Sequence, residues 1–271
     1  MIPRADRKRS AIGTYDRPEA DIAALTEALT ASQPATSDRF VCYRVAGTSP
    51  FADLGRHVER VVFSETFPGN NTAFMAREYG LYEQASTFFL SVDRAEKTAM
   101  GALRVIRYSP TGFKTLNDLA RPDSPIHLSA TDVKRYHQID AWANVWDVGT
   151  VAILSGYRRS GASASLQLYR GMYVTALQEG IDHLIAIIDR LPLRAMTDYL
   201  AIPFVSLCGT NPFSYLGSPD SRAVYGYIPD FDPIIKRRLP EVHDDPAAIR
   251  ALNIIINGTN DQALLFTDDY K

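Results

Sequence analysis

The chain has 271 residues, of which 46% are hydrophobic and 10% aromatic, enough to fill the core of one medium-sized enzyme domain. A formal charge of −2 and a pI near 6.2 give no overall attraction to nucleic acid or to an anionic membrane. The apolar runs are too short to span a membrane, the basic N-terminus lacks the apolar stretch of a signal peptide, and two distant cysteines predict a reduced, cytoplasmic chain.

The first 37 residues predict a polar arm followed by a helix. Residues 1–17 are rich in arginine and lysine, a composition typical of a solvated arm. Apolar residues then recur at Ile22, Leu25 and Leu29, the spacing of one helix face, so we expect a helix over Pro18–Ala31.

Strands and helices alternate through the rest of the chain. Strands are expected at Phe40–Val45, Thr87–Val92, Gly101–Arg107, Trp146–Ile153, His183–Ile188, Phe204–Leu207 and Ala223–Ile228, and helices at Phe51–Thr66, after residue 162, at Leu193–Leu200 and at Pro246–Ile256. The proline-containing segment 109–145 is expected to be the least regular. This order predicts an α/β domain over 38–240, with a C-terminal helix and tail over 241–271 packed on it.

The segment 146–173 predicts a strand, a turn of small residues and the start of a helix. The first turn of a helix has unpaired N–H groups and a positive dipole end, so small residues there let an anion approach closely. Arg158 and Arg159 flank this turn and strengthen the prediction of a phosphate site. A plain structural turn or a charged surface remains the alternative, because every α/β protein contains such joints.

Several motifs follow one another in an order that resembles a known family. Arg158, Gly161 and Ser163 are spaced as in an R/Q-x-x-G-x-G/A pyrophosphate loop, with serine at the last small position. Upstream, Glu78 and the pair Tyr82-Glu83 match the outer positions of E-x-D-x-Y-D, with Gly80 in place of the middle acid.

Three more motifs extend the match. Residues 101–104 carry G-x-x-R, ending at Arg104, and W-D-V-G-T-V-A-I at 146–153 matches W-E-L-S-R-F-A-V, with Asp147 at the glutamate and Thr150 at the arginine. Ala195, Tyr199 and Phe204 match A-x-x-x-Y-x-x-x-G-F, with Pro203 in place of the glycine. Over roughly residues 40–230 the chain resembles the acyl-homoserine-lactone synthases and N-acyl amino acid synthases, a branch of the GNAT N-acyltransferases.

The resemblance implies a GNAT-like fold, a splayed central sheet flanked by helices. It also implies transfer of an acyl group, expected to be fatty, from an acyl carrier protein or acyl-CoA to the amine of an amino acid or similar molecule. The thioester would be a co-substrate, with no permanently bound cofactor. Its expected binding residues are Val151, Ile153, Arg158, Arg159, Ser160, Gly161, Ala162 and Ser163, with a backbone N–H near Val151 to Ile153 as the oxyanion donor.

Acyl transfer to an amine needs a proton acceptor, an oxyanion donor and a route to protonate the thiolate. Asp147 is the first candidate for the acceptor, directly or through water, and Tyr199 for the acid. Glu83 is expected to position the acceptor amine. Structural roles stay open: a strand-end carboxylate for Asp147 and a surface acid for Glu83.

Acceptor binding is expected to involve Glu78, Tyr82, Arg104 and Trp146. Arg104 could hold a carboxylate through two parallel hydrogen bonds, or pair with Glu78 or Glu83 to fix the fold. Substitution of the middle acid and of the family arginine favours an amine other than the homoserine-lactone precursor.

Other classes of protein are disfavoured or remain as competitors. The histidines and cysteines show no metal-ligand spacing, so no metal is expected. A serine hydrolase lacks its G-x-S-x-G elbow, and a dinucleotide site lacks its glycine fingerprint. An acetyl-CoA-dependent acetyltransferase and a non-catalytic thioester-binding protein remain. A carrier protein would need a basic dock, for which Arg158 and Arg159 with Lys236, Arg237 and Arg238 are candidates.

Overall fold

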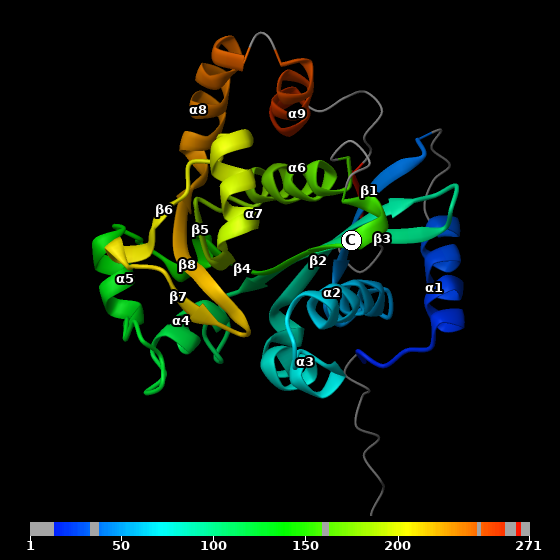
Figure 1. The fold of residues 1–271 in the computed structure, drawn as a ribbon, viewed down its shortest axis with the longest axis horizontal. Coiled ribbons are helices and arrows are strands. Elements are labelled where there is room, and N and C mark those ends of the chain that lie inside the picture. The colour runs from blue at the N-terminus through cyan, green and yellow to red at the C-terminus, as the bar shows by residue number, and fades with distance from the viewer. Residues whose placement is uncertain (1–13, 33–37, 159–162, 243–244, 258–263, 267–271) are drawn as a thin grey trace, which may run out of the picture.

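One mixed sheet organises the chain (Figure 1). A computed structural model describes residues 14–32, 38–158, 163–242, 245–257 and 264–266. The strands are β1 Phe40–Ala46, β2 Ser86–Asp93, β3 Thr98–Arg107, β4 Val145–Ile153, β5 His183–Asp189, β6 Val205–Ser206, β7 Phe213–Tyr215, β8 Ser218–Tyr227 and β9 Leu264–Phe266. Their order in the sheet is β6-β8-β5-β4-β3-β2-β1-β9, and β7 pairs with β8.

The sheet opens between its two central parallel strands. β4 and β5 run parallel, and their pairing ends at Val148 and Ala186 although both strands continue. On its other edge β4 stays paired with antiparallel β3 as far as Ile153. The expected fold class, a mixed α/β sheet that splays at its centre, is confirmed.

Helices cover both faces of the sheet (Figure 1). One face carries α2 Ala52–Thr66, α3 Thr72–Tyr79, α4 Lys114–Leu119 and α5 Ala130–Tyr136, with α1 Glu19–Ala31 beside α2. The opposite face carries α6 Ser163–Gln178 and α9 Pro246–Asn257, with α8 Phe231–Arg238 next to them. Alternating side chains of each strand therefore enter different cores, the direct result of the two-residue period of a strand.

Several short elements complete the chain. α7 Arg190–Arg194 continues as a π-helical turn over Ala195–Tyr199, and a 3₁₀ helix spans Gly80–Ala85. Shorter 3₁₀ turns lie at Trp142–Asn144, Ser155–Tyr157, Leu207–Gly209, Ile228–Asp230 and Leu239–Val242. The expected helix at Leu193–Leu200 is therefore divided, and the expected strand at Phe204–Leu207 is reduced to the two residues of β6.

The expectation that 109–145 is the least regular segment was wrong in one respect, because it contains α4 and α5. The Ser129 side chain accepts a hydrogen bond from the Asp132 N–H at 3.1 Å and starts α5. α3 was also missed, although Asn71 caps it by accepting from the Phe74 N–H at 3.0 Å. These helices are short, so apolar periodicity alone does not reveal them.

The predicted C-terminal helix is present as α9. The Asp245 carboxylate accepts a hydrogen bond from the Ala248 N–H at 3.0 Å, the expected N-terminal cap. α9 packs on α6, where Arg170 donates to the Ile255 carbonyl at 2.8 Å. The described part of the C-terminal segment thus joins the core on the α6 side of the sheet.

Candidate active site

A cavity of about 130 Å³ lies where β4 and β5 part. Its lining is mainly apolar and includes Val148 and Val151 of β4, Ile187 of β5, Met172 of α6, and Met196 and Ile202 beyond α7. Because the two strands no longer pair here, the β5-facing edge of β4 has no strand partner from Gly149 onward in the described part of the chain. The geometry offers an apolar channel beside backbone groups of a strand.

A bulge in β4 lies at the wall of this cavity. Val148 pairs with Val105 and Thr150 with Arg104, which leaves Gly149 as an extra residue without a β3 partner. A Cβ at Gly149 would lie 3.1 Å from the Ile106 side chain, so the position favours glycine. Bulges of this kind redirect a strand's backbone groups, here toward the cavity.

A polar cluster lies against the cavity wall formed by Tyr79 and Tyr215. We call Glu78, Lys114, Asp118 and Tyr215 the lysine cluster. The Lys114 ammonium donates to Asp118 at 2.6 Å, to Glu78 at 3.2 Å and to the Tyr215 hydroxyl at 3.3 Å. Tyr215 itself donates to Asp118. The three N–H donors of Lys114 are thus all used within the protein.

Two predicted acceptor-binding residues lie in or beside this cluster. Glu78 is a member through its bond to Lys114, and its side chain is 11% exposed. The Tyr82 hydroxyl accepts a hydrogen bond from the Asn117 amide at 2.9 Å, which links the 3₁₀ helix to α4. The structure therefore brings Glu78 and Tyr82 to the same side of the cavity, next to α4.

Asp147 lies on β4 immediately before the bulge, but its side chain points to α4 and does not line the cavity. One carboxylate oxygen accepts from the Thr115 N–H and the other from the Thr115 hydroxyl, each at 2.7 Å. Burial raises the pKa of Asp147 to about 6, against the opposing effects of these two bonds and of Lys114.

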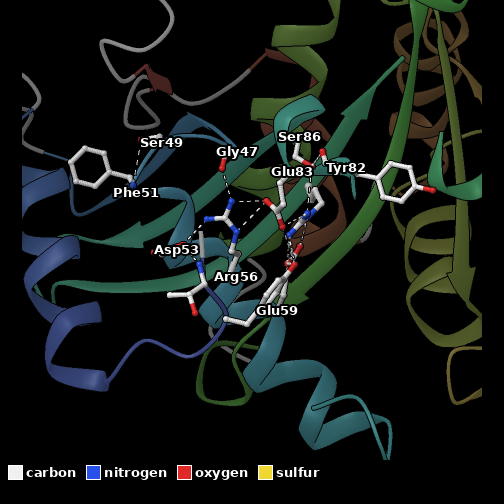
Figure 2. A network of polar contacts seen from close by, with 12 residues as sticks. Gly47, Ser49, Phe51, Asp53, Arg56, Glu59, Tyr82, Glu83 and Ser86 are labelled. Carbon is white, nitrogen blue, oxygen red and sulfur yellow. Dashed lines mark hydrogen bonds and ion pairs between the residues drawn. The ribbon is translucent and has the colours of Figure 1, made fainter. Parts of the chain in front are cut away.

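A second buried network surrounds Arg104 on the α2 side of the sheet. Figure 2 labels four of its members, Asp53, Arg56, Glu59 and Glu83. We call it the arginine cluster; its members are Tyr15, Asp53, Arg56, Glu59, Glu83 and Arg104. The Arg104 guanidinium donates to Glu59 at 2.7 and 2.9 Å, to Glu83 at 3.1 Å, to Tyr15 at 2.6 Å and to Ser86 at 3.4 Å. These contacts use all five N–H donors of a fully buried side chain.

Glu83 belongs to the same network. Its carboxylate accepts from Arg56 at 2.5 and 3.1 Å (Figure 2). It also accepts from Arg104. Burial alone would raise the pKa of Glu83, but the charge of Arg104 and the bonds from Arg56 hold it below its usual value. Thr150, at the position of the family arginine, donates to Glu59. Glu83 and Arg104 thus contact each other. This is the alternative stated above, in which Arg104 pairs with Glu83 to fix the fold and does not bind the carboxylate of an acceptor.

The other predicted residues occupy different surroundings. Trp146 is fully buried and contacts Phe89, with ring centroids 6.2 Å apart. Tyr199 is 41% exposed at the end of the π-helical turn whose Met196 lines the cavity. The Arg158 guanidinium donates to the Ile153 carbonyl at 2.9 Å, which links the end of β4 to the start of the turn.

The predicted phosphate loop falls largely outside the described residues. Positions 159–162, which include Arg159, Ser160, Gly161 and Ala162, are not described, and Ser163 begins α6. In the basic dock, Lys236 bonds to Asp232 and Arg238 to Glu241 within α8 and the turn after it.

The described residues contain neither a candidate metal site nor a helix that could span a membrane. Among the described residues, no group of three or more histidine, cysteine or acidic side chains is placed to hold a metal ion. No helix within the described ranges has the length and apolar character needed to cross a membrane.

Sequence reasoning missed Lys114, Thr115 and Asp118. Their only local signal is a lysine and an aspartate four residues apart, the spacing of a helical ion pair, within a segment expected to be irregular. Tyr215 was missed as well, because the hairpin that carries it has no regular apolar pattern.

No family model and no curated protein match the chain. Solved structures do. The N-acyl amino acid synthase FeeM from uncultured soil microbes aligns over 74% of this chain and 96% of its own, with a TM-score of 0.54 and 14% identity. BjaI, a CoA-dependent acyl-homoserine lactone synthase solved with SAM and isopentyl-CoA, aligns over 83% and 93%, with a TM-score of 0.50 and 12% identity.

The chain has the GNAT fold. The resemblance seen in its motifs is therefore confirmed at the level of the fold, which this chain shares with an acyl-homoserine lactone synthase and an N-acyl amino acid synthase. Both neighbours are named as synthases, one of acyl-homoserine lactones and one of N-acyl amino acids. Identities of 12 and 14% leave the substrates of this chain to be argued from its own residues.

Proposed function

We propose that the chain is an N-acyltransferase that moves an acyl group from a thioester to the amine of an amino acid or similar small molecule. The single observation that carries the proposal is the apolar cavity where β4 and β5 part, next to the bulge at Gly149. Such a cavity can shield the acyl chain from water while unpaired strand N–H groups meet the thioester carbonyl.

The oxyanion of the tetrahedral intermediate would be stabilised by the backbone of β4. Past Val148 the N–H groups on the β5-facing edge have no strand partner, and Val151 lines the cavity. We assign a backbone N–H between Val151 and Ile153 to the oxyanion. N–H groups fixed by a strand are already oriented before the charge develops, which is the basis of this kind of stabilisation.

We assign proton removal from the amine to Asp147. A pKa of about 6 makes this carboxylate a stronger base than an ordinary aspartate while leaving it ionised at neutral pH. Since its oxygens bond to Thr115 and lie off the cavity, the proton must reach it through the Thr115 hydroxyl or through water. Tyr199 is assigned to protonate the departing thiolate from the rim beyond Met196.

The phosphates of the donor would bind at Arg158 and the following residues 159–163, at the start of α6. The donor would be acyl-CoA or the phosphopantetheine of an acyl carrier protein, with the basic residues Lys236, Arg237 and Arg238 as the carrier's dock. On the other side, Glu78 and Tyr82 belong to the region that receives the amine, and Trp146, which is fully buried against Phe89, would support this region by fixing β4 in the core. Arg104 and Glu83 would support this region by fixing β3 to the 3₁₀ helix.

Mass spectrometry of products tests the proposal. The purified protein is incubated with acyl-CoA and acyl-carrier-protein thioesters of several chain lengths together with pooled amines, and free thiol is counted. The proposal predicts an amide with a long-chain donor and equimolar thiol. Acetyl transfer alone would indicate an acetyltransferase, and thioester binding without turnover would indicate a non-catalytic binding protein.

A further inference from the structure

A second cavity, of about 170 Å³, lies beside the first. Ile187, Tyr215 and Leu216 line both cavities and form the partition between them. Whereas the first cavity is mainly apolar, the second carries the polar side chains of Asp118, Arg121, Asp123, Ser124 and Ser214. An apolar cavity that adjoins a cavity of mixed, partly charged lining matches a reaction between an apolar donor and a polar acceptor.

The partition is held in place by the tight turn between β7 and β8. Leu216 and Gly217 have φ values of +46° and +94°, as in two-residue hairpin turns. The Asn70 amide donates to the Leu216 carbonyl at 3.1 Å, which ties the turn to the segment after α2. Tyr215 therefore stands at a fixed place between the cavities, with its hydroxyl on Asp118.

The cations around the second cavity are paired with carboxylates of the protein. The carboxylates are Asp118 and Asp123 in its wall and Glu78 next to Lys114, and the cations are Lys114, Arg121 and Arg77, which lies 3.5 Å from Glu78. Lys114 has its three donors occupied, and Arg121 donates to Asp123 at 3.1 and 3.2 Å. Arg104 likewise has no donor left. Within the described residues, the cationic side chains around this cavity are thus committed to carboxylates of the protein, and none is left for the carboxylate of a ligand.

We propose that the second cavity is the acceptor site and that its acceptor is an amine without a free carboxylate, such as an alkylamine, a diamine or an amino acid amide. The Asp118 carboxylate binds its ammonium group, and the amine nitrogen reaches the thioester past Tyr215. This inference rests on the proposed N-acyltransferase function and narrows its acceptor, since an amino acid would place its carboxylate among the carboxylates of this cavity.

The chemistry balances without a further reactant. The ammonium group first loses one proton to the assigned base and then to solvent. The neutral amine attacks the thioester carbon, so that the C–N bond forms and the C–S bond breaks. The second amine proton ends on the thiolate sulfur, which leaves as the free thiol. No oxidant or reductant is consumed.

Matched acceptor pairs test the inference on the unaltered protein. Each pair differs only in the carboxylate: lysine with 1,5-diaminopentane, phenylalanine with phenethylamine, and alanine with alaninamide. We expect kcat/KM for amide formation to be at least about tenfold higher for the member without the carboxylate. A preference for the amino acids would overturn this inference but leave the N-acyltransferase function standing. Amide from no acceptor would overturn both.

A variant pair tests the role of Asp118. Asp118→Asn should raise KM for the favoured amine by about tenfold or more, while binding of an unreactive thioether analogue of acyl-CoA stays unchanged. Asp132→Asn, at an exposed position on α5, is the control. An unchanged KM in Asp118→Asn with intact folding would contradict the assignment. If that variant fails to fold, the acceptor pairs still decide the class of acceptor.

Discussion

The arginine cluster and the lysine cluster are built from the same residue types but differ in what surrounds them. Arg104 is fully buried, and its hydrogen bonds join β3 to α2, to the 3₁₀ helix and to Tyr15, which precedes α1. Lys114 is almost as buried, yet its partners Asp118 and Tyr215 form walls of a cavity.

This difference indicates a structural role for the arginine cluster and a ligand-binding role for the lysine cluster. A buried ion pair gains little net stability, because desolvation offsets the attraction, but removal of one partner leaves an uncompensated charge. The arginine cluster therefore holds elements of the fold in register. In the lysine cluster the Asp118 carboxylate reaches a space that a small molecule can enter. The comparison predicts that changes in the first cluster alter stability and that changes near the second alter turnover.

The largest expected effect is on folding. Arg104→Met removes five donors, leaves the buried Glu59 without the cation that it contacts, and leaves Glu83 with Arg56 alone. We expect the free energy of unfolding to fall by about 3–5 kcal/mol, measured by urea denaturation at pH 7. Arg190→Met, which breaks an exposed pair with Asp220, is the control and should leave the denaturation midpoint nearly unchanged. Equal effects of the two variants would refute the supporting role.

The next effect is on turnover. Asp147→Asn keeps the size of the side chain but cannot accept a proton, so kcat for amide formation should fall by about 100-fold or more. In the wild type, kcat should decline below about pH 6, where Asp147 becomes protonated, and this decline should be absent from the residual activity of the variant. A variant with normal kcat would show that Asp147 only anchors α4 through Thr115.

The same substitution gives a distinct effect of pH on stability. The folded-state pKa of about 6 lies above the ordinary 3.8, so the folded state binds the proton more tightly than the unfolded state. The stability that this proton contributes is present at low pH and is lost as the pH rises through about 4 to 6. The free energy of unfolding of wild type relative to Asp147→Asn should decrease by about 2–3 kcal/mol across that range. A constant difference would contradict the raised pKa.

The smallest expected effect is on stability and concerns Tyr15, the member of the arginine cluster that precedes α1. Tyr15→Phe removes the hydroxyl that accepts from Arg104 at 2.6 Å and leaves one buried donor unpaired, so thermal denaturation should show a loss of about 1–2 kcal/mol. Tyr43→Phe is a matched control, because the buried Tyr43 hydroxyl has no hydrogen-bond partner among the described residues. It should be neutral or stabilising. The opposite order would disprove the role of Tyr15.

Much of the fold could be predicted from local sequence. The apolar run at 146–153 marks the central strand, and the expected strands around it recur as β1, β2, β3, β5 and β8. The contacts of the candidate site were harder to predict from the sequence. Arg104 finds its partners at residues 15, 59 and 83, and Asp147 bonds to Thr115, which lies 32 residues away. Spacing along a chain does not reveal contacts of this range, nor the point where β4 leaves β5.

The central claim is that the cavity between β4 and β5 holds the acyl chain of a thioester donor. Met172 lines this cavity from α6, and Leu177 lies on the same helix with 53% of its surface exposed. The most direct measurement is kcat/KM against donor chain length for wild type, Met172→Trp and Leu177→Trp, with folding checked by thermal denaturation. We predict that Met172→Trp lowers kcat/KM for long-chain donors by about tenfold or more relative to short ones, and that Leu177→Trp retains the wild-type profile. An unchanged profile in folded Met172→Trp would contradict the account.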